Sequence, residues 1–379
     1  MSFVLDEEQQ LIQQNARDFA LKYIEPYADQ VDRESFFPRE VVQQLAENDF
    51  MGFYLPEEFG GAEAGYLNYV IGIEEIAKVS AGVAAILVNH ASLAAYTINK
   101  WGTTQQKQNY LTAMCKGEKL GTFALNEPGA APGVGPNRVL AVKDGDNYIL
   151  NGRKTYIANG AVADIYIVFG VTDEKQGPKG MSAFIVDANS EGISVVRNIG
   201  KMGLRGCPWA EIAFNNVKVS ADNLIGVEGK GLAMAKEAKG LASISEGALV
   251  VGVIQAAMED ASEYAKQRIQ FGQPIANFPA IQNMLAEMAT NVHIARLAIY
   301  HAADLIDKEE PAETEAAMVK LFINRISQSS MADAIQIEGG YGYSEDMMVS
   351  RYFREVKGVL LSDSSIDFPE QTIAKELLG

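Results

Sequence analysis

The spacing of the apolar residues changes twice along this chain of 379 residues, and that restricts the fold more than any other feature. In the first third, apolar side chains recur every three or four residues, which predicts helices over 40–48, 67–79 and 81–101. From residue 120 to 219 the apolar runs are short and are broken by Gly, Asn and Asp, which is typical of strands. After Gly229 the helical spacing returns in three long segments.

These changes predict an α+β protein of several domains. We expect an N-terminal helical domain over 1–121, a central β-barrel or β-sandwich domain over 122–231 and a C-terminal four-helix bundle over 232–379. Within the β-domain we expect strands over 165–171 and 182–186. A further strand is expected over 148–156, with an internal turn at Asn151-Gly152.

Composition excludes several classes of protein. The net charge of −17 disfavours binding to nucleic acid or to anionic membranes. No run of 18 apolar residues predicts a membrane span, and the acidic N-terminus does not resemble a signal peptide, so we expect a cytoplasmic protein. Two cysteines and three scattered histidines predict neither a disulfide framework nor a metal site.

Two segments of the β-domain could face a ligand. In GTFALNEPGA (121–130) the chain leaves a strand and turns at Glu127-Pro128-Gly129, where Gly permits a close turn. In KTYIANG (154–160), Tyr156 ends a strand. Taken alone, 121–130 is better interpreted as an ordinary β-turn, and Tyr156 is equally consistent with a tyrosine at a strand end that has its hydroxyl at the surface.

Two further motifs lie in the C-terminal helices. Arg268 follows a long helix in YAKQRIQFGQPI (264–275), where its guanidinium could bind phosphate or the carbonyls at the helix end. Gly339-Gly340, in QIEGGYGYSED (336–346), would let backbone N–H groups approach a phosphate closely.

Together with KMGLRG (201–206), GVEGKGL (226–232) and the order of the domains, these motifs resemble the acyl-CoA dehydrogenase superfamily over essentially the whole chain. The resemblance implies an FAD-dependent oxidoreductase that desaturates an acyl thioester, attached to CoA or to a carrier protein, between Cα and Cβ. A carboxylate would take the α-proton and flavin N5 the β-hydride. It also implies a homotetramer, built as a dimer of dimers, that passes electrons to an electron-transfer flavoprotein or another acceptor.

The resemblance assigns flavin contacts to particular residues. Leu125 and Asn126 would line the pyrimidine side of the flavin, and Tyr156 would cover one of its faces beside Ile157 and Ala158. A second group would reach the FAD of a neighbouring subunit: Arg268, Phe271, Gln336, Gly339 and Gly340. Ser365 and Asp367 are also assigned to the cofactor.

The catalytic base falls on Asp363, where most of the family has Glu. Without the resemblance, Asp363 would read as part of a polar loop, SDSSID. The alternative base position of some members, near residue 242, has no carboxylate at 241–244, and Glu246 one turn later is a second candidate.

The residues expected near the substrate depart furthest from the family. Pro132 replaces a residue that usually carries a hydroxyl, Trp209 adds bulk at the entrance, and Ser243 replaces a common Arg. These changes predict a short or compact acyl thioester, branched and cyclic ones included. Two alternatives stay open: a flavoenzyme of the same fold that eliminates, isomerises or oxygenates, and a non-catalytic binding paralogue.

Overall fold

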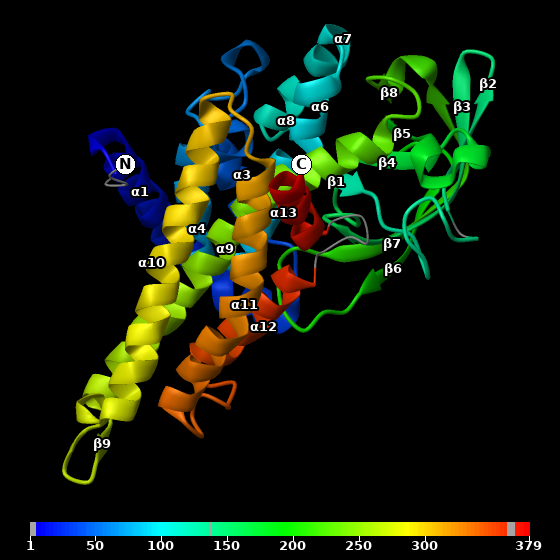
Figure 1. Ribbon diagram of the computed structural model, residues 1–379. Helices are drawn as coiled ribbons and strands as arrows, with labels where there is room; N and C mark the ends of the chain where they lie inside the picture. The colour runs from blue at the N-terminus through cyan, green and yellow to red at the C-terminus, as the bar shows by residue number, and fades with distance from the viewer. Residues whose placement is uncertain (1–4, 137, 362–367) are drawn as a thin grey trace.

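The computed structural model describes residues 5–136, 138–361 and 368–379. Its elements follow the predicted order, with helices, then a sheet, then helices, and Figure 1 shows the sheet on one side of the helical body. The N-terminal helices are α1 (Glu7–Phe19), α2 (Glu25–Glu34), α3 (Arg39–Glu47), α4 (Tyr66–Val79), α5 (Ala81–Leu87), α6 (Tyr96–Trp101), α7 (Thr104–Gln106) and α8 (Thr112–Cys115).

The predicted helix over 81–101 is continuous but not uniform. The π-helical segment η4 (Val88–Ala95) joins α5 to α6. Such wide turns occur often at functional sites. His90 in η4 is fully buried, and its Nδ1 accepts a hydrogen bond from the backbone N–H of Gly121 at 3.0 Å. Burial lowers the pKa of His90 to about 4, so the ring is neutral and fixes the start of the first strand.

The central domain is one eight-stranded sheet in the order β6-β7-β3-β2-β4-β5-β8, with β1 beside β4. Its strands are β1 (Gly121–Ala124), β2 (Leu140–Asp144), β3 (Asn147–Ala158), β4 (Ile165–Val171), β5 (Met181–Asp187), β6 (Ile193–Ile199), β7 (Trp209–Ser220) and β8 (Leu224–Ile225). Most neighbours are antiparallel, as predicted, but β1 and β2 both pair with β4 in parallel.

The predicted turn at Asn151-Gly152 is wrong, because β3 runs through it without a break. The pairing of β3 with β7 shifts between Leu150 and Gly152, which marks a β-bulge or similar irregularity in the pairing of the two strands. Gly152 has φ 142°, and a Cβ there would lie 2.4 Å from the carbonyl oxygen of Arg138. Glycine is required here because the backbone before β2 approaches closely, whereas turns favour Asn-Gly because both residues tolerate a positive φ.

Strand β4 is buried on both faces. Alternate side chains point to opposite sides of a sheet. Ile165, Ile167 and Phe169 pack toward the helices, whereas Tyr166 and Val168 pack with side chains of the other strands. The sheet therefore has one core of its own and one that it shares with the helical body.

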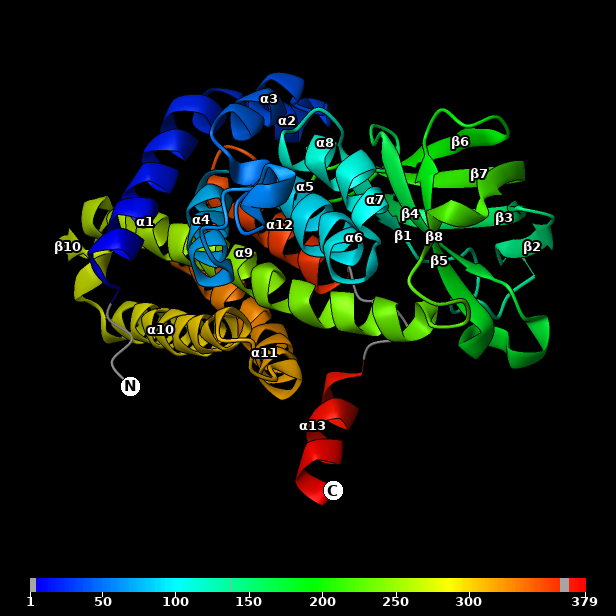
Figure 2. The same cartoon turned by 90° about the horizontal axis from the view of Figure 1, so that it is seen from above.

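The C-terminal bundle consists of α9 (Gly231–Gln267), α10 (Pro279–Asp307), α11 (Glu313–Glu338) and α12 (Met348–Leu360). A short hairpin of β9 (Ile269–Gln270) and β10 (Gln273–Pro274) joins α9 to α10 at the end far from the sheet (Figure 1). The last helix, α13 (Pro369–Leu378), projects from the body (Figure 2). The predicted four-helix bundle is confirmed.

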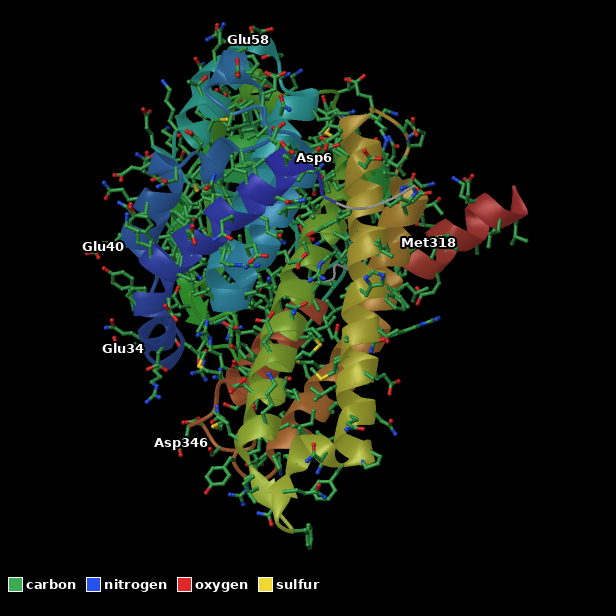
Figure 3. All side chains as sticks on the ribbon, turned by 90° about the vertical axis from the view of Figure 1, so that its left-hand side faces the viewer. Asp6, Glu34, Glu40, Glu58, Met318 and Asp346 are labelled. Atoms are coloured by element: carbon green, nitrogen blue, oxygen red, sulfur yellow. The ribbon has the colours of Figure 1, made fainter. Side chains whose placement is uncertain are left out.

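Two helical stretches are long and apolar enough to span a membrane, Ala81–Trp101 and Gly231–Gln267. Their apolar windows are 89% and 83% buried inside the protein, so they are core helices here. Acidic side chains lie on the outside of the protein, and Figure 3 shows three of them, Glu34, Glu40 and Glu58, extending from the surface.

Candidate active site

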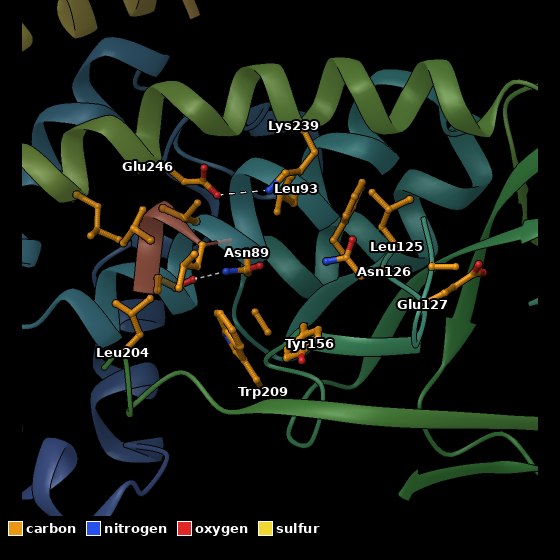
Figure 4. A pocket seen from close by; sticks show the side chains of 18 of the residues that line it. Asn89, Leu93, Leu125, Asn126, Glu127, Tyr156, Leu204, Trp209, Lys239 and Glu246 are labelled. Atoms are coloured by element: carbon orange, nitrogen blue, oxygen red, sulfur yellow. Dashed lines mark hydrogen bonds and ion pairs between the residues drawn. The ribbon is translucent and has the colours of Figure 1, made fainter. Parts of the chain in front are cut away.

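A cavity of about 540 Å³ lies where the N-terminal helices, the sheet and α9 meet. Figure 4 shows α9 along one side and Tyr156 and Trp209 on the opposite side. Its apolar lining comes from all of these parts and from the end of α12: Ala85, Val88, Leu93, Phe123, Leu125, Ala130, Ala158, Leu204, Leu249, Val359 and Leu361.

A buried ion pair fixes the two loops of the β-domain to each other. Lys154 Nζ donates to the carbonyl of Leu125 and to Glu127 Oε1, both at 2.8 Å. Glu127 also accepts from the backbone N–H groups of Gly133 at 2.7 Å and Val139 at 2.9 Å. Burial lowers the pKa of Lys154, and the adjacent Glu127 opposes that shift. The segments 121–130 and 154–160 therefore form one rigid unit at the cavity.

Tyr156 presents its ring to this cavity from an unusual backbone conformation. Its φ is 54°, and β3 changes register against β7 between Lys154 and Ile157. The side chain is 53% exposed and meets Trp209 edge to face, with the ring centroids 6.0 Å apart. A left-handed backbone at a non-glycine residue persists only where the surroundings hold it. The half-exposed aromatic surface suits a flat aromatic ligand.

Helix α9 brings two charged side chains to the cavity. Lys239 Nζ and Glu246 Oε1 lie 3.5 Å apart, and their side chains are only 5% and 15% exposed. Seven residues are about two helical turns, so both project from one face of the helix. Ser243 between them turns back, because its Oγ donates to the carbonyl of Lys239 at 2.9 Å.

The structure separates the predicted site residues into four groups. One group lines the cavity: Leu125, Asn126, Tyr156, Ala158 and Trp209. A second group is buried and does not line it: Pro132, Ile157 and Ser243. Asp363, Ser365 and Asp367 lie outside the described residues.

The remaining predicted residues are exposed at the far end of the bundle: Arg268, Phe271, Gln336, Gly339 and Gly340. The Arg268 guanidinium lies over the ring of Tyr341, 5.9 Å from its centroid. Phe271 is 93% exposed with φ 51° at the tip of the hairpin. Within one chain these residues do not meet the cavity, as Figure 1 shows by the distance of β9 from the sheet.

Sequence reasoning missed four polar residues of the site: Asn89, Glu127, Lys154 and Lys239. One of them, Lys239, carried a signal, in its spacing from the candidate base Glu246. Lys239 and Glu246 are charges seven residues apart in a helix that is otherwise mostly apolar, and that spacing places both on one face. Lys154 and Glu127 gave no such signal, because their pairing depends on how two strands meet.

Models of one protein family match nearly the whole chain. They are described as the N-terminal, middle and C-terminal domains of acyl-CoA dehydrogenase and match residues 6–118, 122–217 and 229–377. The chain belongs to the acyl-CoA dehydrogenase family. The predicted family, the three-part architecture and the enzyme class, an FAD-dependent acyl-thioester oxidoreductase, are confirmed.

Curated members of the acyl-CoA dehydrogenase family match from end to end. A 3-(aryl)acrylate reductase of Clostridium sporogenes is 42% identical over 98% of this chain and 99% of its own. An acyl-CoA dehydrogenase of Bacillus subtilis is 39% identical over 98% of both chains. The caffeyl-CoA reductase-Etf complex subunit CarC of Acetobacterium woodii is 37% identical over 98% of both.

Solved structures of the family superpose closely. Butyryl-CoA dehydrogenase of Megasphaera elsdenii has a TM-score of 0.95 at 35% identity, over the whole of both chains. PigA with FAD and proline has a TM-score of 0.93 at 30% identity, over 100% of this chain and 99% of its own. Family and neighbours imply FAD as the cofactor here. The rigid loops and the half-exposed ring of Tyr156 fit a flavin.

Proposed function

We propose that this enzyme catalyses FAD-dependent α,β-dehydrogenation of an acyl thioester, or the reverse reduction of the unsaturated thioester. The observation that carries the proposal is the joint location of the two β-domain loops and an apolar cavity. The loops are held by Lys154 and Glu127, and the cavity of about 540 Å³ is of the size that binds small ligands. An acyl chain in this cavity would lie beside the ring of Tyr156.

The cofactor would rest on the loops at the cavity. Leu125 and Asn126 would contact one edge of the flavin, and Tyr156 would cover a face, with the backbone of Ile157 and Ala158 beside it. Bound there, FAD supplies the two-electron chemistry, as acceptor or donor of the substrate's β-hydride. Ser365 and Asp367 are proposed as further contacts.

The exposed residues at the far end of the bundle would complete the site of another subunit. A guanidinium suits the FAD diphosphate, and Arg268 is exposed with no carboxylate bonded to it within the described chain. Phe271, Gln336, Gly339 and Gly340 lie at the same end. We propose a homotetramer, a dimer of dimers, in which each cofactor is held by two chains.

Asp363 is the proposed base for the α-proton. Leu361, two residues before it, lines the cavity. Removal of the proton would leave an enolate-like thioester, whose carbonyl oxygen needs hydrogen-bond donors as the charge develops. In the reductive direction the same carboxyl group returns the proton to Cα. Glu246 is the competing candidate, because it also faces the cavity.

The direction of the reaction would depend on the electron partner. The relatives named 3-(aryl)acrylate reductase and caffeyl-CoA reductase-Etf complex subunit support reduction of an unsaturated substrate with electrons from an electron-transfer flavoprotein. We propose such a flavoprotein as partner, and a cytoplasmic location. Trp209 and Tyr156 at the cavity favour a compact or aryl-bearing acyl group over a long straight chain.

Anaerobic bleaching of the flavin by a panel of acyl thioesters tests the reaction. A short or aryl-substituted thioester should bleach the flavin, and Asp363→Asn should slow bleaching at least about 100-fold while FAD stays bound. Glu246→Gln is the matched variant, because it also removes one carboxylate from the cavity region, and it should still bleach.

Three outcomes would contradict parts of this proposal. If Glu246→Gln stopped bleaching and Asp363→Asn did not, Glu246 would be the base. If the flavin bound but no thioester bleached it, a different chemistry such as elimination or isomerisation would be favoured. A chain that could not take up FAD at all would be a binding paralogue.

A further inference from the structure

The carboxamide of Asn89 faces the cavity from the wall that the N-terminal helices form. Asn89 lies in the π-helical segment η4, and such wide turns occur often at functional sites. Its neighbours on this wall are apolar: Ala85, Val88 and Leu93. Figure 4 shows Asn89 apart from Asn126, a proposed contact of the flavin edge. Asn89 is therefore a polar group at a part of the cavity that the acyl group would occupy.

One hydrogen bond determines how this carboxamide is oriented. Asn89 Nδ2 donates to the carbonyl oxygen of Ala85, four residues earlier, at 2.8 Å, and Figure 4 draws this bond as a dashed line. The bond holds the nitrogen against the helix backbone, so Oδ1 points away from it. Oδ1 has no hydrogen-bond partner among the residues that the structure describes. An amide oxygen has two lone pairs, so Asn89 can accept a hydrogen bond from a ligand in the cavity.

A second asparagine makes the same local bond in a different place. Asn68 Nδ2, on α4, donates to the carbonyl oxygen of Ala64, four residues earlier, at 2.8 Å. Asn68 does not line the cavity, and its Oδ1 is buried in the protein without a partner among the described residues. The local bond is thus common to both residues, and the position at the cavity distinguishes Asn89.

The charged side chains at the cavity favour an uncharged ligand group. Lys154 pairs with Glu127 at 2.8 Å, and Lys239 lies 3.5 Å from Glu246. Each pair combines one positive and one negative charge. A further charge, brought in by the substrate, would be costly to desolvate beside the apolar wall. Asn89 is itself uncharged, which suits it to a neutral group on the substrate.

We propose that Asn89 Oδ1 accepts a hydrogen bond from an uncharged hydroxyl group on the acyl chain of the substrate. A hydroxyl supplies the donor that the amide oxygen needs and adds no charge. A methyl group or a fluorine atom at the same position would exclude water from Oδ1 without replacing its hydrogen bond. A carboxylate has no proton to donate and would bring a charge into the cavity.

This inference rests on the proposed acyl-thioester reaction and makes its substrate class more specific. Sites that hydrogen-bond a substrate hydroxyl discriminate strongly against analogues that lack it, because a polar group of the site is then left unpaired. Asn89 would thus determine which acyl group reacts, without taking part in proton or hydride transfer.

The test uses the FAD-loaded enzyme and three sets of CoA thioesters. Two sets are built on 3-phenylpropionyl-CoA, substituted at the meta or at the para carbon of the ring, and the third is built on pentanoyl-CoA, substituted at its terminal carbon. Each set carries a hydroxyl, methyl, fluorine or carboxylate substituent. The initial rate of anaerobic flavin bleaching at limiting thioester gives the preference. In at least one set the hydroxyl compound should exceed both the methyl and the fluorine compound by about 10-fold or more.

Two matched variants assign the preference to Asn89. Asn89→Leu keeps a side chain of similar size without an acceptor, and should lower the ratio of the hydroxyl rate to the methyl rate by about 10-fold or more. Asn68→Leu removes the same kind of local bond away from the cavity and should keep the ratio of the wild type. The flavin absorbance of each purified variant checks that it is loaded. If Asn89→Leu does not retain FAD, the smaller side chain of Asn89→Ala takes its place.

The outcomes separate the proposed reaction from the role of Asn89. If no compound of any set bleaches the flavin of the wild type, the proposed reaction fails. If the methyl or the fluorine compound of every set reacts as fast as the hydroxyl compound, the reaction stands and the role of Asn89 is refuted. A preference of the wild type for the carboxylate compounds would also overturn it. So would a hydroxyl preference that persists in the Asn89 variant, or one that is lost equally in Asn68→Leu.

Discussion

The cavity and the far end of the four-helix bundle each contain a buried carboxylate, in opposite environments. At the cavity, Glu127 is 4% exposed and accepts hydrogen bonds from Lys154 and from two backbone N–H groups. At the far end, Glu338 is 2% exposed, and neither of its oxygens has a hydrogen-bond partner among the described residues. The Glu127 carboxylate fixes two loops, whereas the Glu338 carboxylate makes no hydrogen bond within the described ranges of the chain.

The protonation of Glu338 follows from this environment. Burial, and after it the nearby Asp260, raises the pKa of Glu338 from 4.5 to about 7. Asp260 itself accepts from the hydroxyl of Tyr352 at 3.1 Å, and burial raises its pKa as well. A buried carboxylate is thus kept charged where a cation and N–H groups meet it, and is driven toward the neutral form where they do not.

Removing the cation that pairs with Glu127 should have the largest effect on stability. Lys154→Met leaves a charged Glu127 buried without its cation, which should lower the free energy of unfolding by about 3–5 kcal/mol. The loops that would hold the flavin should loosen as well. Chemical denaturation and the flavin content after gel filtration measure both effects.

A second substitution checks the cause of that loss. Adding Glu127→Gln to Lys154→Met removes the unpaired charge and keeps one oxygen as an acceptor for one of the two backbone N–H groups, that of Gly133 or that of Val139. Part of the lost stability should return. If Lys154→Met alone cost less than about 1 kcal/mol, the ion pair would not be what fixes the loops.

Removing the charge at the far end should have a smaller effect of opposite sign. The folded-state pKa of Glu338 lies above its ordinary value, so the stability associated with its proton is complete at low pH and is lost as the pH rises toward 7. Glu338→Gln abolishes that loss and should stabilise the protein by roughly 1–3 kcal/mol at pH 8, with little change at pH 5.

Melting curves across this pH range, with the exposed residue Glu345→Gln as control, test the prediction. The difference in melting temperature between Glu345→Gln and the wild type should be the same at pH 5 and pH 8. An equal effect of Glu338→Gln at pH 5 and pH 8 would mean that Glu338 does not titrate in this range.

Local rules and the resemblance together predicted much of the fold. The change of apolar spacing predicted the order of helices and strands, because spacing depends only on neighbouring residues. The same local rules failed at Asn151-Gly152, where the need for glycine comes from Arg138 in the segment before β2. Local sequence cannot distinguish a glycine that turns a chain from one that admits a neighbouring backbone.

Sequence reasoning predicted site residues correctly only where they lie together in a short motif. Leu125, Asn126, Tyr156 and Ala158 lie in two short motifs and line the cavity as a group. The residues that stabilise those motifs were missed, because Lys154 and Glu127 are 27 positions apart and meet only when strands pair. The role of Asp363 stays a prediction, since it lies outside the described residues.

The smallest effect on stability is expected for the second Lys–Glu pair. Lys239→Met with Glu246→Leu replaces a loose ion pair on an apolar wall by side chains of similar size, and such replacements are often neutral or stabilising. The free energy of unfolding should stay within about 1 kcal/mol of the wild type. Lys239→Met alone should cost more, because it removes the cation that lies 3.5 Å from the Glu246 carboxylate and keeps the charge of that carboxylate. Chemical denaturation of both variants and of Lys154→Met under the same conditions compares the two ion pairs by their effects on the free energy of unfolding. A loss for the double variant as large as that for Lys154→Met would make Lys239 and Glu246 a structural pair as well.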